Sequence, residues 1–179
     1  LQAGVHVLVE KPIATTLAEA DGLLGLAAKK SLVLQVGHLQ RFNPAFRALA
    51  AQPGRPLFID IERLAPFKER GTDVDVILDL MIHDLDLALA LAKAPVAEVS
   101  ACGFRVLTDA IDIANARIEF GDGCVASLSA GRVSQSSRAD REFVNVLLAT
   151  LVADRRRQHF DPRVFLPARR DVVAVGVAV

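Results

Sequence analysis

The chain has 179 residues, of which 52% are hydrophobic and 23% charged, and its 21 basic residues balance 21 acidic ones. This hydrophobic content excludes general disorder, and the zero net charge gives no electrostatic footprint for nucleic acid or an anionic membrane. The two cysteines, Cys102 and Cys124, are too few for a disulfide framework or a zinc site and are most simply small core residues on strands. The sequence has no signal-peptide pattern and no apolar run of roughly 18–20 residues, so we expect a cytoplasmic protein with no membrane span.

The first forty residues predict a strand, a helix and a second strand. Val5–Val9 is a short β-branched run that ends before Pro12, and Leu32–Val36 is a similar run. Between them, Thr16 and Glu19 have the spacing of a capping box at a helix start. Such a unit implies a right-handed crossover between parallel strands, and it is half of a doubly wound domain at most.

From Pro53 onward the pattern changes. Alternation over residues 57–62 predicts a strand, and a helix is expected from Val76 to Lys93, where Pro95 stops it. Three further strands are expected at Val96–Leu107, Asp112–Phe120 and Cys124–Val133. Because the last two are joined by a Gly-Asp-Gly turn, we expect an antiparallel sheet with a helix on one face.

The tail from Gln135 does not resemble further strands of that sheet. It contains two arginine clusters, Arg155–Arg157 and Arg169–Arg170, without a clean period of 2 or 3.6. Val144–Val152 is compatible with either a helix or a strand, because periodicity does not decide over so short a run. Arginine clusters are usually solvated surface, and the neutral chain gives no reason to expect nucleic acid there.

The triplet Glu10-Lys11-Pro12 follows the first predicted strand. Ligands of open α/β sheets bind outside the carboxyl ends of the strands, so Lys11 is placed to reach a bound substrate. The alternative is a surface lysine that happens to follow a strand.

Asp79 and His83 are spaced four residues apart on the predicted helix. A carboxylate one turn away can orient an imidazole and favour its charged form, which suits a general base. A structural Asp–His pair that pins the helix is the first alternative. A metal site that includes Asp86 is the second, although no fourth ligand is apparent.

The stretch Gly37–Pro44 follows the second predicted strand and therefore lies at the same edge of the sheet. Arg41 in this stretch has two interpretations: a contact with a phosphate or ribose, or a surface ion pair.

Three strings, AGVHVLVEKPIA, QVGHLQRFNPAF and DLMIHDLDLAL, together resemble the Gfo/Idh/MocA family of NAD(P)-dependent oxidoreductases. The resemblance covers roughly Leu1 to Ser134. Within the family, the three strings are similar to those of nucleotide-sugar 3-dehydrogenases, such as those acting on UDP-N-acetylglucosamine. It implies that Lys11 is the catalytic lysine and that Asp79 and His83 are the helix-borne pair. It also implies that Glu10 and Pro12 belong to the motif that lines the nicotinamide ribose. We therefore expect Glu10, Lys11 and Pro12 to contact the cofactor, together with Arg41 from its position after the second strand.

The resemblance implies an α/β chain: the C-terminal remnant of a Rossmann domain (residues 1–52), then an α+β domain with an open antiparallel sheet (53–134) and an atypical tail (135–179). The family's G-x-G-x-x-G loop is absent, as a truncated or frame-shifted gene product would explain.

We expect an oxidoreductase, or a fragment of one, that moves hydride between NAD or NADP and a sugar or nucleotide-sugar hydroxyl. The alternative is a non-catalytic sheet module for dimerisation or sugar binding. We also expect a homo-oligomer formed through one sheet face, with Val99, Ala101 and Gly103 beside Ile113, Asn115 and Arg117.

Overall fold

A computed structural model describes residues 1–68, 74–134, 142–149 and 172–178, with side chains described up to Ser134. The elements are β1 (Val7–Val9), α1 (Leu17–Lys29), β2 (Leu34–Val36), the 3-10 helix η1 (Leu39–Phe42), α2 (Pro44–Ala50), β3 (Arg55–Leu64), the π-helical turn η2 (Ile77–Met81), α3 (Ile82–Ala92), β4 (Val96–Phe104), β5 (Ile113–Phe120), β6 (Val125–Gly131), β7 (Glu142–Ala149) and β8 (Val172–Ala178). No helix in these described ranges is long and apolar enough to cross a membrane.

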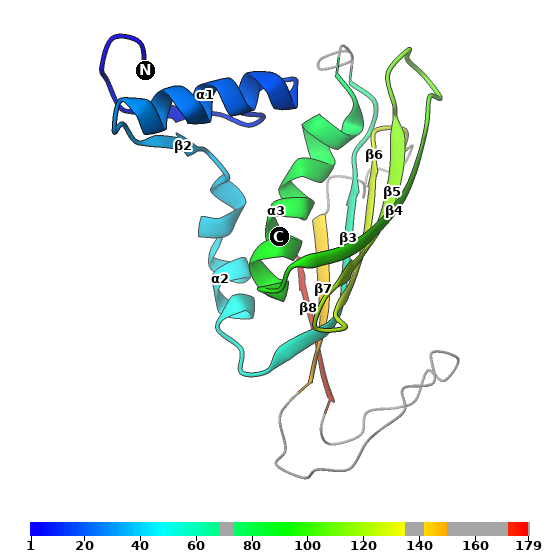
Figure 1. The fold of residues 1–179 in the computed structure, drawn as a ribbon. Helices are drawn as coiled ribbons and strands as arrows, with labels where there is room; N and C mark the ends of the chain where they lie inside the picture. Colours follow the sequence, from blue (N-terminus) through cyan, green and yellow to red (C-terminus); the bar gives the residue numbers. More distant parts are fainter. Residues whose placement is uncertain (69–73, 135–141, 150–171, 179) are drawn as a thin grey trace.

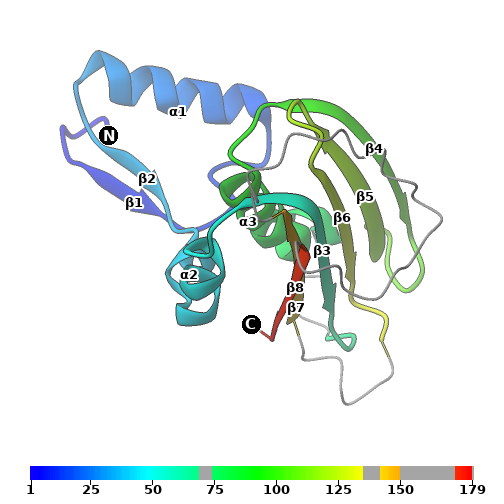
Figure 2. The same ribbon diagram turned by 90° about the horizontal axis from the view of Figure 1, so that it is seen from below.

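The elements form two separate sheets (Figure 1). One has two parallel strands, β1 and β2, with α1 running beside them. The other has six strands in the order β4-β5-β6-β3-β7-β8, and α3 lies against one of its faces (Figure 2). The chain passes from the small sheet to the large one through η1 and α2.

The predicted strand–helix–strand unit is present. Val7 pairs with Leu34 and Val9 with Val36 in a parallel ladder. The helix begins with the expected capping box: the Glu19 N–H donates to the Thr16 hydroxyl, and the Thr16 N–H donates to the Glu19 carboxylate. The first N–H groups of a helix have no acceptor within the helix, and the side chains of Thr16 and Glu19 satisfy two backbone N–H groups here. The start of this helix is therefore determined by neighbouring residues.

The large sheet is mixed, which corrects the expectation of a purely antiparallel sheet. β3 pairs with β6 in parallel from Phe58↔Val125 to Leu64↔Gly131, whereas the other neighbouring strands pair antiparallel. A parallel pair needs a long crossover connection, and the chain between β3 and β6 contains α3, β4 and β5. The sequence pattern indicates only strands that follow each other through short turns, and such strands pair antiparallel. It gives no sign of the parallel pairing of β3 with β6.

Two segments of the tail are strands, so the expectation that the tail adds none is wrong for them. β7 pairs antiparallel with β3, from Arg55↔Ala149 to Arg63↔Glu142, and β8 pairs with β7. The ambiguous run that begins at Val144 is therefore a strand as far as Ala149. Strands pair through their backbone N–H and C=O groups, so the periodicity of the side chains does not show which strands are neighbours. The two arginine clusters lie outside the described residues.

The expected single helix from Val76 to Lys93 is divided into two helical forms. Ile77–Met81 is a π turn, in which N–H groups bond five residues back, and the regular helix α3 begins at Ile82. Lys93 ends α3 in the left-handed conformation, with a φ of 54°. The π turn contains Asp79, so it alters the geometry of the predicted Asp79–His83 pair.

The core lies between α3 and the inner face of the large sheet. Its buried side chains come from α2, β3, η2, α3, β5 and β6 and include Phe46, Ile59, Ile61, Met81, Leu87, Leu91, Ile118 and Leu128. The buried thiol of Cys124 also belongs to this cluster.

β4 is exposed along its whole length, which corrects two expectations. Cys102 is exposed on this edge strand and is not a core residue. Val99 pairs with Ile118 and Ala101 with Ala116, so these residues share the inner face. The predicted interface face, which placed Val99 beside Arg117, is wrong because cross-strand partners lie on the same side of a sheet.

Candidate active site

Lys11, which follows β1 of the small sheet, contacts the π turn η2 that leads into α3 on the large sheet. Its Nζ donates to the backbone oxygen of Asp79 at 2.6 Å and lies 3.3 Å from Asp79 Oδ1. The two side chains are 20% and 39% exposed, so the ion pair is partly shielded from water. Lys11 follows β1, and Asp79 precedes α3; the fold thus brings two sequence motifs together across 68 residues. We call the region around the Lys11–Asp79 contact the joint between the two sheets.

Pro12 and Glu10 flank Lys11 at the end of β1. The Lys11–Pro12 peptide bond is cis. The carboxylate of Glu10 lies against Gly37 at the start of the loop after β2, where an added Cβ would come within 3.2 Å of the Glu10 carboxylate. A side chain at this position would therefore require the Glu10 carboxylate to shift by a few tenths of an ångström.

His83 lies in the first turn of α3 and is partly buried. Burial lowers the pKa of its imidazole to about 4, and the positive charges of Arg63 and Lys11 and the neighbouring His38 add to this effect, whereas Asp79 opposes it. The imidazole is therefore neutral near pH 7, and its buried Nδ1 has no hydrogen-bond partner among the described residues. A neutral imidazole can accept a proton.

This arrangement differs from the expected pairing of Asp79 with His83. The carboxylate of Asp79 contacts Lys11, and the net change in the pKa of His83 is downward. The π turn contributes to the difference, because residues four apart are not stacked there as they are in an α-helix.

Arg41 is held by Asp86 of α3. Its Nε and Nη2 each donate to the Asp86 carboxylate at 2.7 Å, and this hydrogen bonding raises the pKa of Arg41. The Asp86 side chain is 10% exposed. The ion-pair interpretation of Arg41 therefore describes this structure, and the pair connects η1 to α3. Within the described ranges, no three His, Cys, Asp or Glu side chains are grouped to hold a metal ion.

His38 is a residue of this region to which the sequence analysis gave no role. Its Nδ1 is buried, lies 4.0 Å from Asp86 Oδ1 and has no hydrogen-bond partner in the part of the chain that the structure describes. Its position directly after Gly37, at the carboxyl end of the second parallel strand, was the available signal.

A buried ion pair lies beneath His83. Arg63 of β3 donates from Nε and Nη2 to Asp84 Oδ1 at 2.9 and 2.7 Å, and both side chains are buried. Sequence reasoning assigned no function to either residue, because the partners are 21 residues apart in different elements. The Arg63 charge is one cause of the lowered pKa of His83.

Comparison with known proteins identifies relatives of the chain. The profile described as "Oxidoreductase family, NAD-binding Rossmann fold" matches residues 1–38, and that of the GFO/IDH/MocA C-terminal domain matches residues 46–148. UDP-N-acetylglucosamine 3-dehydrogenase of Acidithiobacillus ferrooxidans is 49% identical over 134 residues, which are 74% of this chain and 43% of the relative. Myo-inositol dehydrogenase Hyg17 of Streptomyces leeuwenhoekii is 32% identical over 147 residues, covering 74% of this chain and 45% of the relative.

The solved structure of the Acidithiobacillus ferrooxidans enzyme is also similar. It has a TM-score of 0.74 and 43% sequence identity, over 84% of this chain and 50% of that one. The chain thus spans about half the length of the relatives that it matches. The matched C-terminal domain includes α3, β3 and the strands that pair with β3, and the chain belongs to the Gfo/Idh/MocA oxidoreductase family.

Proposed function

We propose that the chain carries the substrate-side residues of an NAD(P)-dependent oxidoreductase that acts on a hydroxyl of a sugar or nucleotide sugar. The observation that carries the proposal is the Lys11–Asp79 contact at the joint. Both residues lie close enough to the neutral imidazole of His83 for their charges to affect the pKa of His83. The names of the relatives, a UDP-N-acetylglucosamine 3-dehydrogenase and an inositol dehydrogenase, support the substrate class.

Oxidation of a secondary alcohol removes a hydride from carbon and a proton from oxygen. A bound nicotinamide supplies the hydride acceptor. Lys11 Nζ donates a hydrogen bond to the substrate oxygen and stabilises the negative charge that develops there. Asp79 holds the amine in place, and the neutral imidazole of His83 accepts the hydroxyl proton.

The donor set fits one side of the cofactor. Glu10, Lys11 and Pro12 lie at the carboxyl end of β1, where the nicotinamide of a parallel-sheet enzyme binds, and Arg41 follows β2. The 179 residues contain no G-x-G-x-x-G loop to bind the pyrophosphate. We therefore expect the 179-residue chain to bind NAD or NADP weakly or not at all in calorimetric titration. Micromolar affinity would contradict this expectation.

Sugar binding tests the proposal without depending on cofactor affinity. UDP-N-acetylglucosamine and myo-inositol are titrated into the wild-type chain and two variants by NMR. Lys11→Met should weaken binding of at least one of them, and Lys29→Met, at an exposed position of α1, should not. Equal binding by all three proteins, or none, would contradict the proposed site.

Turnover separates the enzyme from its alternative. With millimolar NAD or NADP and the sugar that binds, mass spectrometry should detect a product that has lost two hydrogens, and His83→Gln should abolish its formation. Binding of both the sugar and the cofactor without any product would favour the non-catalytic module.

We further propose that the outer face of the large sheet mediates self-association. Phe58, Leu64 and Phe104 lie on this face and are 38%, 39% and 62% exposed. Exposed aromatic and aliphatic side chains among polar ones are typical of a subunit interface. Light scattering should show an oligomer at micromolar concentration, and a stable monomer would contradict the proposal.

A further inference from the structure

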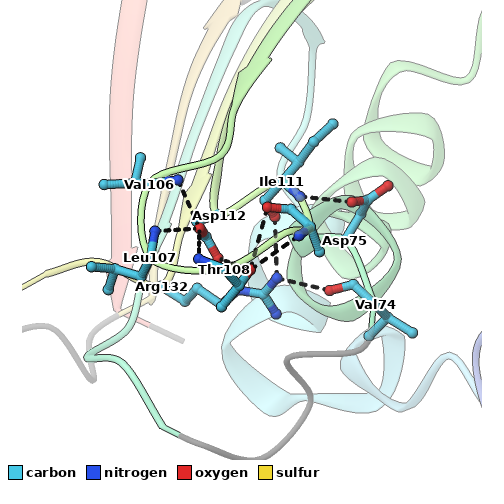
Figure 3. A network of polar contacts seen from close by, with 9 residues as sticks. Val74, Asp75, Val106, Leu107, Thr108, Ile111, Asp112 and Arg132 are labelled. Carbon is cyan, nitrogen blue, oxygen red and sulfur yellow. Dashed lines mark hydrogen bonds and ion pairs between the residues drawn. The ribbon is translucent and has the colours of Figure 1, made fainter.

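A buried carboxylate organises the loop between β4 and β5. The side chain of Asp112 is fully buried, and its Oδ2 accepts the backbone N–H groups of Val106, Leu107 and Thr108 at 2.8, 2.7 and 2.9 Å (Figure 3). Its Oδ1 accepts the Thr108 hydroxyl and Arg132 Nε, both at 2.8 Å. Burial alone would raise the pKa of Asp112, but these donors hold it well below its usual range. The carboxylate is thus ionised and fully hydrogen-bonded.

The same network extends to the segment before the π turn. Arg132 Nη2 donates to the carbonyl oxygen of Val74 at 2.8 Å and to that of Ile111 at 3.3 Å. The Ile111 N–H donates to Asp75 Oδ1 at 2.7 Å, and its carbonyl accepts the Val76 N–H at 2.9 Å. In Figure 3 these groups converge from the loop and from the segment that leads into the helix. Two hydrogen bonds therefore join the loop directly to this segment, and Arg132 joins the two again by donating to one carbonyl oxygen of each.

Asp75 links this network to the joint. Its backbone oxygen accepts the N–H groups of Leu78 and Asp79 at 3.0 and 3.1 Å, directly at the start of the π turn. Asp79 in turn holds Lys11. A continuous series of contacts thus runs from Asp112 through Arg132, Ile111, Asp75 and Asp79 to the amine.

Ile111 packs against the core, but the first part of the loop is not held by burial of its own side chains. Val106 and Leu107 are 53% and 54% exposed, so the carboxylate of Asp112 supplies much of what fixes their backbone. A buried ion pair is stable only when all its hydrogen bonds form together, which makes the positions of the loop, Arg132 and residues 74–76 depend on one another. Such mutual dependence is suited to fixing the geometry of a distant turn.

We propose that the Asp112–Arg132 pair, acting through Asp75, positions the π turn so that Asp79 holds Lys11 at the joint. In this proposal Asp112 and Arg132 are positioning residues that act on Lys11 through Asp75 and Asp79. The inference rests on the proposed function in one respect: Lys11 and Asp79 are members of the proposed site.

The reactivity of the Lys11 amine reports on this positioning. Limited acetylation of the full chain, followed by peptide mass spectrometry, gives the relative rates at Lys11 and at the exposed Lys29 in one sample. A charge-assisted hydrogen bond that weakens by a fraction of its strength changes such a rate by roughly threefold or more. We expect Asp112→Asn to raise the Lys11 rate by this amount and to leave the Lys29 rate unchanged.

Asp122→Asn is the matched control. The Asp122 carboxylate also accepts a backbone N–H, that of Cys124, but in the turn at the other end of β5. The eight residues of β5 separate it from Asp112 by roughly 26 Å. This variant should leave both rates unchanged. An unchanged Lys11 rate in folded Asp112→Asn, or an equal rise in both Asp variants, would overturn the inference.

Two milder variants keep the test valid if Asp112→Asn does not fold. Thr108→Val removes one donor to Asp112, and Arg132→Lys keeps the charge but cannot reach both Asp112 and the Val74 carbonyl. Each should raise the Lys11 rate, and unchanged rates in both would overturn the inference.

Asp79→Asn separates this inference from the proposed function. A faster Lys11 in Asp79→Asn but not in the network variants would reject the network and retain the site. No change in any of them would show that the Asp79 carboxylate does not hold the Lys11 amine, and would reject the role of Asp79 in the proposed site.

Discussion

The β1-α1-β2 unit and the six-stranded sheet are stabilised in different ways. Among the apolar side chains of residues 1–45, all described by the structure, only Ala27 is buried. Large apolar side chains of this region, at Val5, Leu8, Leu17, Leu24 and Val33, are more than half exposed. The large sheet instead has a continuous core under α3.

This difference explains where the candidate site lies. The small unit has a helix cap and a parallel ladder but little hydrophobic burial, so its position depends on polar contacts with the other region. Those contacts include Lys11–Asp79 and, from the η1 turn that follows β2, Arg41–Asp86. The same side chains therefore orient the small unit and form the candidate site.

The buried Arg63–Asp84 pair should give the largest effect, because it lies within the core of the large sheet. Asp84→Ala leaves the Arg63 charge buried without this carboxylate and should lower the free energy of unfolding by about 3–5 kcal/mol. Arg117→Ala, which removes an ion pair with Glu119 on the exposed face, should cost about 1 kcal/mol or less. Urea denaturation of both variants tests the contrast. Similar losses of unfolding free energy in the two variants would contradict the burial of the Arg63–Asp84 pair in the core.

Acidification should act on the joint through His83. Its folded pKa of about 4 lies below the ordinary 6.5, so as the pH falls through 6.5 the unfolded chain takes up a proton that the folded chain does not. Stability should therefore fall as the pH falls from 6.5 to 4, by up to about 1.4 kcal/mol per pH unit. His83→Gln should remove this component, as seen in urea midpoints across that range. Parallel curves for the two proteins would show that His83 is not desolvated in the fold.

The smallest effect is expected at the cap of α1. Thr16→Ala removes both side-chain hydrogen bonds of Thr16 and should cost about 1 kcal/mol. Because the small unit has little core, this loss should appear as faster amide exchange within α1, with exchange in β5 and β6 unchanged. Equal acceleration in both regions would mean that the two unfold as one unit.

The sequence predicted features whose signals are local. The capping box at Thr16 and the strands around α1 are confirmed, because neighbouring residues determine them. The parallel β3–β6 pair, the strands at 142–149 and 172–178 and the exposure of Cys102 were missed, because each depends on the order of strands in the sheet.

The candidate site was predictable in part for the same reason. The motifs that include Lys11, Asp79 and His83 stand out in the sequence, and the fold brings Lys11 and Asp79 into contact. The hydrogen bonds of Asp79 with Lys11 form at a π turn, and we recognise no sequence signal for that turn. The two buried ion pairs likewise join residues far apart in the sequence: Arg63 and Asp84 are 21 residues apart, and Asp112 and Arg132 are 20 apart.

The pKa of His83 tests most directly whether the joint assembles the proposed site. NMR titration of the imidazole should give a midpoint of about 4 in the wild-type chain. Lys11→Met should raise this midpoint, because it removes a nearby positive charge that disfavours the imidazolium. A wild-type midpoint near 6.5, or one that Lys11→Met leaves unchanged, would contradict the account that Lys11, Asp79 and His83 form one site.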